Sequence, residues 1–168
     1  MGKRTKAREC ALQMLYQWDM TREPMDRVAG LFWQVRSSTP DTRAMAERLA
    51  RGAQGDLETL DRAIGSASTH WRFERIAPVD RNILRIGAYE LLREPETPAS
   101  VIIDEAVEMA KRFGEADSPA FVNGVLDAVH RALRKGPEAT TEKTATADKA
   151  TADEKRGAPG RARRRKDA

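Results

Sequence analysis

Residues 117–129 read Asp-Ser-Pro-Ala-Phe-Val-Asn-Gly-Val-Leu-Asp-Ala-Val and carry a strong helix signal. Ser118 supplies a hydroxyl of the kind that caps helix N-termini, and Pro119 has a φ already fixed near the helical value. The apolar residues that follow recur at helical spacing and share one face: Val122, Val125, Leu126, Val129 and Leu133. The pattern predicts a last, amphipathic helix that begins at Ser118.

Phe121 lies at the edge of that apolar face, close to the start of the predicted helix, with Asn123 nearby. Only 5% of the chain is aromatic, so a large ring at this place calls for an explanation. It is either the rim of the hydrophobic core or a surface platform on which an unpaired base can stack. The residues alone leave both interpretations open.

The other end of the chain begins with positive charge. Lys3, Arg4, Lys6 and Arg8 all precede the first acidic residue, Glu9. They run directly into an apolar helical face made of Ala7, Cys10, Ala11, Met14, Leu15 and Trp18. Cations at a helix N-terminus oppose the helix dipole, so folding alone does not favour them there. A polyanion would neutralise this cluster, and nucleic acid is the usual one; the alternative is a basic start without a partner.

The remaining patterns up to residue 135 are also helical. Thr39 and Pro40 predict a further helix start, as cap and first residue. Gly52 and Gly55 interrupt the apolar pattern that follows, so either one long helix or two shorter ones can form there. Three more helices are expected, over residues 28–35, 78–92 and 98–113. Without an alternating apolar run, the sequence predicts an all-α fold of two small helical bundles packed together.

From Gly136 onward the composition changes to near-repeats of Thr, Ala, Asp and Lys, with no aromatic or large aliphatic residue. Such a segment cannot bury enough apolar surface to offset the entropy of ordering it. We therefore predict a folded domain over residues 1–135 and a disordered, basic-tipped tail over 136–168. Nine of the 30 basic and six of the 26 acidic residues lie in this tail, so three of the four net positive charges belong to it.

Composition also excludes several classes of chemistry. One cysteine rules out an internal disulfide, and two histidines without metal-ligand spacing do not predict a zinc site. No glycine-rich phosphate loop and no apolar run of membrane-spanning length is present. We expect a cytoplasmic binding protein with no catalytic residue, no metal and no cofactor.

Three blocks of sequence resemble the NusB family of transcription antitermination factors. They are Ala-Arg-Glu-Cys-Ala-Leu-Gln-Met-Leu-Tyr-Gln-Trp (7–18), Pro-Val-Asp-Arg-Asn-Ile-Leu-Arg-Ile-Gly-Ala-Tyr-Glu-Leu-Leu (78–92) and Phe-Gly-Glu-Ala-Asp-Ser-Pro-Ala-Phe-Val-Asn-Gly-Val-Leu-Asp (113–127). Residues 101–111 are also similar, so the resemblance covers residues 3–134. It implies an all-helical protein of two bundles.

The resemblance further implies binding of boxA-type RNA in ribosomal RNA operon leaders, as a heterodimer with the ribosomal protein NusE. Other Nus factors and RNA polymerase join this pair. By motif match, the RNA-binding residues are Lys3, Arg4, Lys6, Arg8, Asp117 and Phe121. Tyr16 and Asp80 match positions on the partner face. Thr5 stands where some relatives carry another basic residue, which makes this cluster thinner.

Two alternatives stay open at this point. A similar domain forms the front of some ribosomal RNA cytosine methyltransferases, although those enzymes need a following α/β domain. Some family members also form homodimers that can bury the RNA surface, so self-association is possible here.

Overall fold

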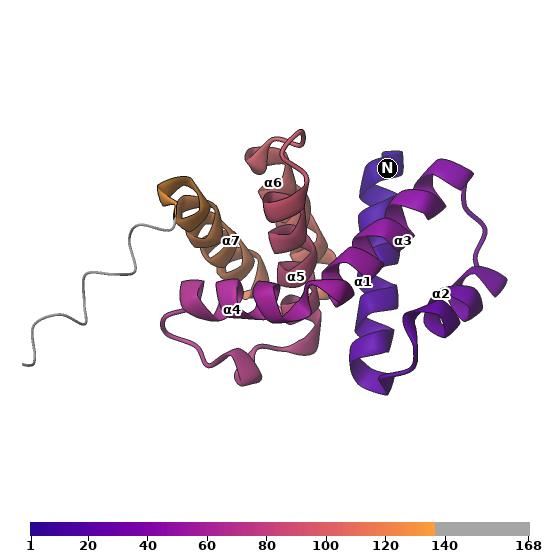
Figure 1. The fold of residues 1–168 in the computed structure, drawn as a ribbon, viewed down its shortest axis with the longest axis horizontal. Coiled ribbons are helices and arrows are strands. Elements are labelled where there is room, and N and C mark those ends of the chain that lie inside the picture. Colours follow the sequence, from indigo (N-terminus) through magenta and orange to yellow (C-terminus); the bar gives the residue numbers. More distant parts are fainter. Residues whose placement is uncertain (137–168) are drawn as a thin grey trace, which may run out of the picture. The chain divides into compact units, whose positions relative to one another are not determined.

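The computed structural model describes residues 1–136, which form seven α-helices, one 3-10 helix and no strand (Figure 1). The elements are α1 (Lys3–Thr21), α2 (Met25–Gln34), α3 (Pro40–Gly55), α4 (Leu57–Ala67), η1 (Phe73–Arg75), α5 (Pro78–Arg93), α6 (Ala99–Phe113) and α7 (Ser118–Lys135). The prediction of an all-α fold is confirmed. The predicted tail lies outside the described residues, apart from Gly136.

The helices form two groups. One contains α1, α2 and α3, and the other contains α4, α5, α6 and α7 (Figure 1). Helix α5 connects them, because α1 and α3 pack against it as well as α4, α6 and α7. The predicted apolar face of α1 is buried throughout, from Ala7 to Trp18. Leu12, on a neighbouring strip, is buried too, since α1 has α2 and α3 on one side and α5 on another.

The region around Gly52 and Gly55 resolves into two helices. Helix α3 ends at Gly55, and α4 begins at Leu57 after a single non-helical residue, Asp56. The two glycines differ in their surroundings: a Cβ at Gly55 would meet no atom within 4 Å, whereas one at Gly52 would collide with the Tyr89 ring. Gly52 therefore lets α5 approach α3 closely, and Gly55 is free of that constraint.

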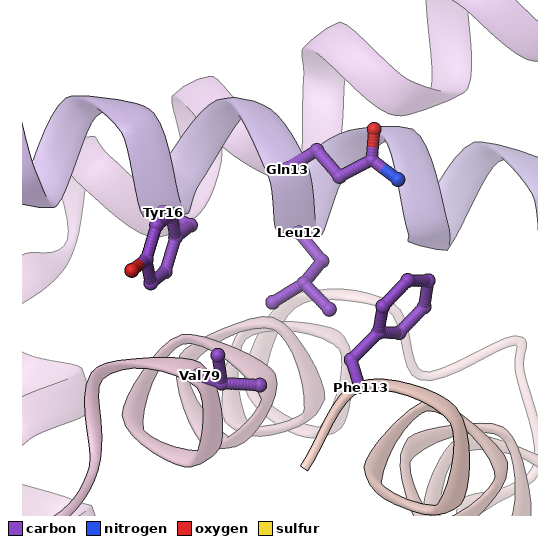
Figure 2. A pocket seen from close by; sticks show the side chains of 5 residues that line it. All are labelled: Leu12, Gln13, Tyr16, Val79 and Phe113. Atoms are coloured by element: carbon purple, nitrogen blue, oxygen red, sulfur yellow. The ribbon is translucent and has the colours of Figure 1, made fainter.

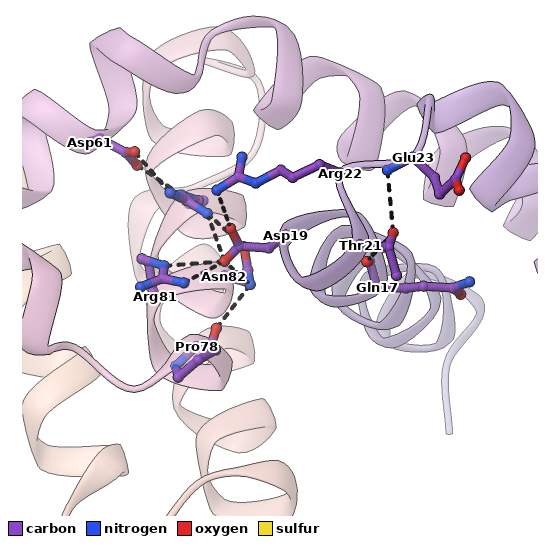
Figure 3. A network of polar contacts seen from close by, with 10 residues as sticks. Gln17, Asp19, Thr21, Arg22, Glu23, Asp61, Pro78, Arg81 and Asn82 are labelled. Carbon is purple, nitrogen blue, oxygen red and sulfur yellow. Dashed lines mark hydrogen bonds and ion pairs between the residues drawn. The ribbon is translucent and has the colours of Figure 1, made fainter.

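A buried carboxylate joins the end of α1 to the start of α5 (Figure 3). Asp19 Oδ2 accepts hydrogen bonds from Arg81 at 2.7 Å and from the Asn82 side chain at 3.1 Å, and Oδ1 accepts one from Arg22 at 3.0 Å. Burial opposes ionisation of Asp19, but hydrogen bonds and nearby positive charge outweigh it and lower its pKa. The carboxylate thus stays charged and holds the two helices together.

The same network reaches α4 through Arg85. Its guanidinium donates to both carboxylate oxygens of Asp61, at 2.7 and 2.8 Å, and lies 3.2 Å from Asp19 Oδ2. Arg85 also donates to the Asn82 side-chain oxygen at 3.0 Å. One polar network therefore fixes α1, α4 and α5 relative to one another.

Candidate nucleic-acid interface

The start of α1 presents an open cluster of positive charge. Lys3, Arg4 and Lys6 are exposed, and the first turn of α1 contains no acidic residue. Within residues 1–136, none of the three forms an ion pair; Arg4 donates only a 3.3 Å hydrogen bond to the Thr97 hydroxyl. Their charges are therefore not neutralised within the described part of the protein, and they can meet a polyanion.

Arg8, predicted to belong to this cluster, is instead buried. Its side chain is 2% exposed and forms a bidentate pair with Glu90 of α5, itself 1% exposed. Arg8 Nε lies 2.9 Å from Glu90 Oε2, and Arg8 Nη2 lies 2.8 Å from Oε1. The geometry thus places Arg8 as an anchor between α1 and α5, with no guanidinium group free for a phosphate.

Helix α6 also contacts the start of α1, through Glu105. Arg8 Nη1 lies 3.6 Å from Glu105 Oε2, and the Thr5 hydroxyl donates to Glu105 Oε1 at 3.1 Å. Thr5, which thins the basic cluster, thus helps to hold the start of α1 on α6. The three exposed cations project from a helix end that is fixed on two sides.

A groove at the start of α7 forms a second candidate surface. It has a volume of about 480 Å³ and lies between the 71–77 connector, the start of α5 and the start of α7. Two aromatic rings line it: the Trp71 and Phe121 rings meet edge to face, with centroids 6.0 Å apart and an interplanar angle of 63°. We call this the Trp71 groove. Its lining residues are Trp71, Arg75, Ile76, Ala77, Asp80, Glu115, Asp117, Ser118, Ala120 and Phe121.

The sequence left open whether Phe121 lies at the rim of the hydrophobic core or on the surface, and the structure shows elements of both. Its half-buried ring packs against the hydrophobic core and also lines the Trp71 groove. Asp117 is exposed at the same groove. The structure thus brings these two predicted RNA-binding residues together. Trp71, which is 59% exposed, was missed because it lies in a connector without periodicity.

The start of α7 differs from the prediction in one detail. Ser118 is the first helical residue, but its side chain does not cap the helix. The Ser118 hydroxyl accepts a hydrogen bond from the Glu115 backbone N–H at 2.9 Å and donates one to Asp80 Oδ2 at 2.8 Å. Tertiary contact with α5 therefore replaces the predicted local cap.

Asp80, predicted to face a partner, is buried. It is 8% exposed, and its Oδ1 has no hydrogen-bond donor in the described part of the chain. Burial raises the pKa of Asp80, the Ser118 hydrogen bond opposes this, and the negative charge of Glu115 adds to the rise. Asp80 therefore belongs to the wall of the Trp71 groove more than to an open protein-binding face.

Tyr16, the other predicted partner residue, lies beside a smaller apolar groove between α1, α5 and the end of α6 (Figure 2). This Tyr16 groove has a volume of about 210 Å³ and is lined by Leu12, Gln13, Tyr16, Val79 and Phe113. Tyr16 is 39% exposed, and the buried Gln13 Oε1 has no donor within the described residues. In the sequence, the motif match of Tyr16 to a partner-face position pointed to this surface.

The cationic cluster and the Trp71 groove are well separated. Arg4 and Asp19 are 15 residues apart on α1, a rise of about 22 Å, and Asp19 contacts α5 next to the groove. Within residues 1–136, no metal-binding group of side chains is found. The helices described include none that is long and apolar enough to cross a membrane.

Comparison with known sequences identifies relatives of this chain. The model of the NusB family matches residues 5–131. The "Transcription antitermination protein NusB" of Sorangium cellulosum (strain So ce56) is 50% identical over 129 residues, which cover 77% of this chain and 92% of that protein. The protein of the same name from Myxococcus xanthus (strain DK1622) is 41% identical, over 80% and 99% of the two chains.

Solved structures of NusB proteins also resemble this chain. A structure of T. maritima NusB matches with a TM-score of 0.70 at 33% identity, over 78% of this chain and 92% of that chain. A structure of the antitermination factors NusB and NusE in complex with dsRNA matches with a TM-score of 0.71 at 28% identity, over 79% and 98%. The names of these relatives describe transcription factors, which confirms that the chain is not an enzyme. The chain belongs to the NusB family.

Proposed function

We propose that this chain binds boxA-type single-stranded RNA of ribosomal RNA operon leaders together with ribosomal protein NusE, and so acts in transcription antitermination. The observation that carries the proposal is the cluster of Lys3, Arg4 and Lys6, exposed and without ion pairs in the described residues. Among the described residues 1–136, no acidic side chain pairs with this charge at the helix N-terminus, whereas RNA phosphates would.

The half-buried ring of Phe121 supports a single-stranded ligand. Bases in a duplex are stacked on each other, whereas unpaired bases can stack on aromatic side chains. The cations would hold the backbone at one end of α1, and Phe121 would contact a base near the other end. Asp117 would lie beside that base, where its charge repels the neighbouring phosphates.

For the partner, we propose that NusE binds over the Tyr16 groove. The groove is apolar, and Tyr16 offers a ring together with a hydroxyl that can hydrogen-bond, a combination typical of protein interfaces. The related NusB structure that contains NusE and dsRNA supports such a partner. The complex would act in the cytoplasm and join other Nus factors on RNA polymerase. A second copy of this chain could instead cover the RNA-binding surface.

Salt-dependent RNA binding tests the cationic part of the proposal. Lys3→Ala with Lys6→Ala removes two phosphate contacts, so the slope of log K against log salt should become shallower by about 1.4 for a single strand. Arg27→Ala with Arg62→Ala is the control, because it removes equal charge from exposed sites on α2 and α4. An equal slope change in both double variants would show that only net charge matters.

Titration of a boxA-type RNA and a shuffled RNA of equal composition, with and without NusE, tests specificity and partner together. Light scattering after size-exclusion chromatography then separates a 1:1 complex with NusE from a homodimer. If the shuffled RNA binds equally well in the presence of NusE, the boxA proposal is wrong.

A further inference from the structure

A third groove adjoins the cationic cluster, and arginines from three helices line it. Its volume is about 440 Å³, and its walls are Arg4 of α1, Arg48 of α3, Arg93 at the end of α5 and residues 94–97 of the loop that follows. We call it the Arg48 groove. Because Arg4 belongs to the cationic cluster as well, the cluster and the groove share one side chain and form one surface.

Each guanidinium group in this groove has more N–H donors than its contacts use. A guanidinium group carries five N–H bonds. Within residues 1–136, Arg4 makes a single hydrogen bond, at 3.3 Å to a threonine hydroxyl, and no ion pair. Arg48 pairs with Glu94 through Nη1, and Arg93 donates to Asp56 through Nε at 2.6 Å. Arg4 is exposed and the other two arginines are about half exposed, so N–H groups of all three are accessible to a ligand.

The net charge of the groove does not by itself attract an anion. Glu94 and Asp56 each neutralise one arginine, and Glu96 is a further, exposed acid that lines the groove. Attraction must therefore come from directed hydrogen bonds, which guanidinium groups form in pairs with phosphate or carboxylate oxygens. Glu96 forms no ion pair among the described residues, so its charge would repel an entering anion. Affinity for an anion thus depends on the arginine donors, and Glu96 limits it.

Folding gives little reason for this arrangement. Ion pairs at half-exposed sites add little to stability, because water screens them. Nevertheless, α1, α3 and α5 place guanidinium groups around one hollow. A carboxylate offers two oxygen atoms in one plane, whereas a phosphate group offers oxygen atoms at the corners of a tetrahedron, which donors from several directions can reach together. The convergence of arginines from three helices therefore favours phosphate.

We propose that the Arg48 groove binds phosphate groups, with Arg4, Arg48 and Arg93 donating hydrogen bonds to the phosphate oxygens. For the phosphates of an RNA strand, this inference rests on the proposed RNA binding: a strand held by the cationic cluster would pass Arg4 and enter the groove. It adds two arginines, from α3 and α5, to the residues that hold the strand. A free polyphosphate has the same chemistry, and inorganic pyrophosphate is the probe for that second source.

Binding of a single-stranded RNA to the full chain, measured by fluorescence anisotropy over a range of salt concentrations, tests the strand as the source. Arg48→Ala with Arg93→Ala removes two phosphate contacts, so the slope of log K against log salt should become shallower by about 1.4. Arg27→Ala with Arg62→Ala is the matched control, because it removes two exposed arginines that also pair with glutamates. The control should keep the wild-type slope.

Glu96→Gln tests the groove without breaking an ion pair. Removing this exposed acid should tighten binding of the phosphate ligand about twofold at low salt, and the gain should vanish at high salt, where the repulsion is screened. Glu58→Gln is the control, because Glu58 is an exposed acid on α4, away from the groove. It should leave the affinity unchanged.

Isothermal titration calorimetry with inorganic pyrophosphate tests a free polyphosphate as the source. Pyrophosphate should then bind wild type and the Arg27–Arg62 control with equal affinity. It should bind the Arg48–Arg93 variant roughly tenfold more weakly or worse, because hydrogen bonds to a charged group are lost. The slope for RNA would in that case be the same in all three proteins.

The outcomes separate the two sources and the two proposals. A shallower RNA slope in the Arg48–Arg93 variant assigns the groove to the strand, and loss of pyrophosphate binding at an unchanged slope assigns it to a free polyphosphate. If this variant behaves like the control in both assays, the proposal is overturned. If it does not fold, an unchanged affinity of Glu96→Gln for both ligands overturns the proposal. Lys3→Ala with Lys6→Ala, measured alongside, tests the proposed RNA binding itself: a shallower slope in that variant alone keeps RNA on the cationic cluster and removes it from the groove.

Discussion

Replacing Arg8 by alanine should strongly destabilise this protein, although Arg8 belongs to a basic stretch of sequence. The change leaves the Glu90 carboxylate, 1% exposed, without the bidentate partner that now lies at 2.8–3.2 Å. Removing one member of a buried ion pair costs about 3–5 kcal/mol, because the remaining charge stays desolvated. For a folded body of this size we expect the melting temperature to fall by roughly 10–20 °C.

Circular dichroism melts at 222 nm would measure this fall, and urea unfolding would give the free energy. Arg8→Met with Glu90→Leu should recover most of the stability, because neither buried charge then remains. Glu105 is only partly buried, so its carboxylate can turn to solvent in that variant. Arg4→Ala is the matched control on the same helix: an exposed arginine whose loss should leave the melting temperature almost unchanged.

RNA binding provides the refuting result. If Arg8 is an anchor, Arg8→Ala should keep the wild-type salt slope when assayed well below its melting temperature. If the variant instead melts within about 3 °C of wild type and its slope is shallower by about 0.7, then Arg8 contacts phosphate in solution. The buried ion pair between Arg8 and Glu90 would then be absent from the protein that binds RNA.

Four further results are expected. Phe121→Ala should weaken RNA binding by about 1–3 kcal/mol, measured by fluorescence anisotropy. The same change should destabilise the protein by less than the ~3–5 kcal/mol expected for a fully buried ring. Unchanged RNA affinity would reject the stacking role. Burial raises the pKa of Asp80, so its stabilising, protonated form is lost as pH rises through that pKa. Asp80→Asn should therefore gain melting temperature relative to wild type at pH 7 and lose the gain toward pH 4; a gain independent of pH would contradict this. Gly52→Ala should destabilise by about 1–3 kcal/mol in urea, because the methyl group collides with the Tyr89 ring, whereas Gly55→Ala, with open space, should not. Truncation after Lys135 should leave the melting temperature unchanged, since the residues beyond it include no large apolar side chain.

The sequence was sufficient to predict the helices and much of their buried faces. Helical spacing of apolar residues is a local property, so the faces of α1 and α7 could be predicted with few errors. One error is Leu133, which shares the spacing of the α7 face but is 43% exposed near the end of the helix. The break between α3 and α4 was left open because the same two glycines are compatible with either outcome.

The contacts of polar side chains could not be predicted in the same way. Arg8 looks like its exposed neighbours in sequence, and only Glu90, 82 positions away, makes it a buried residue. The hydroxyl of Ser118 had a plausible local acceptor role, but Asp80, 38 positions away, takes part in its actual hydrogen bonding. Trp71 gave no signal, since a connector has no period and its meeting with Phe121 depends on the fold.

Helix α1 also fixes the distance between two of the predicted binding residues. It carries Arg4 near its start and Tyr16 in its second half, 12 residues or about 18 Å apart. Arg8 and Asp19 fasten it to α5 at two points, so it cannot slide or turn. Inserting one residue between Arg8 and Tyr16 would rotate the two ends by about 100° relative to each other. Relatives of this chain can therefore vary the side chains along α1 far more easily than its length.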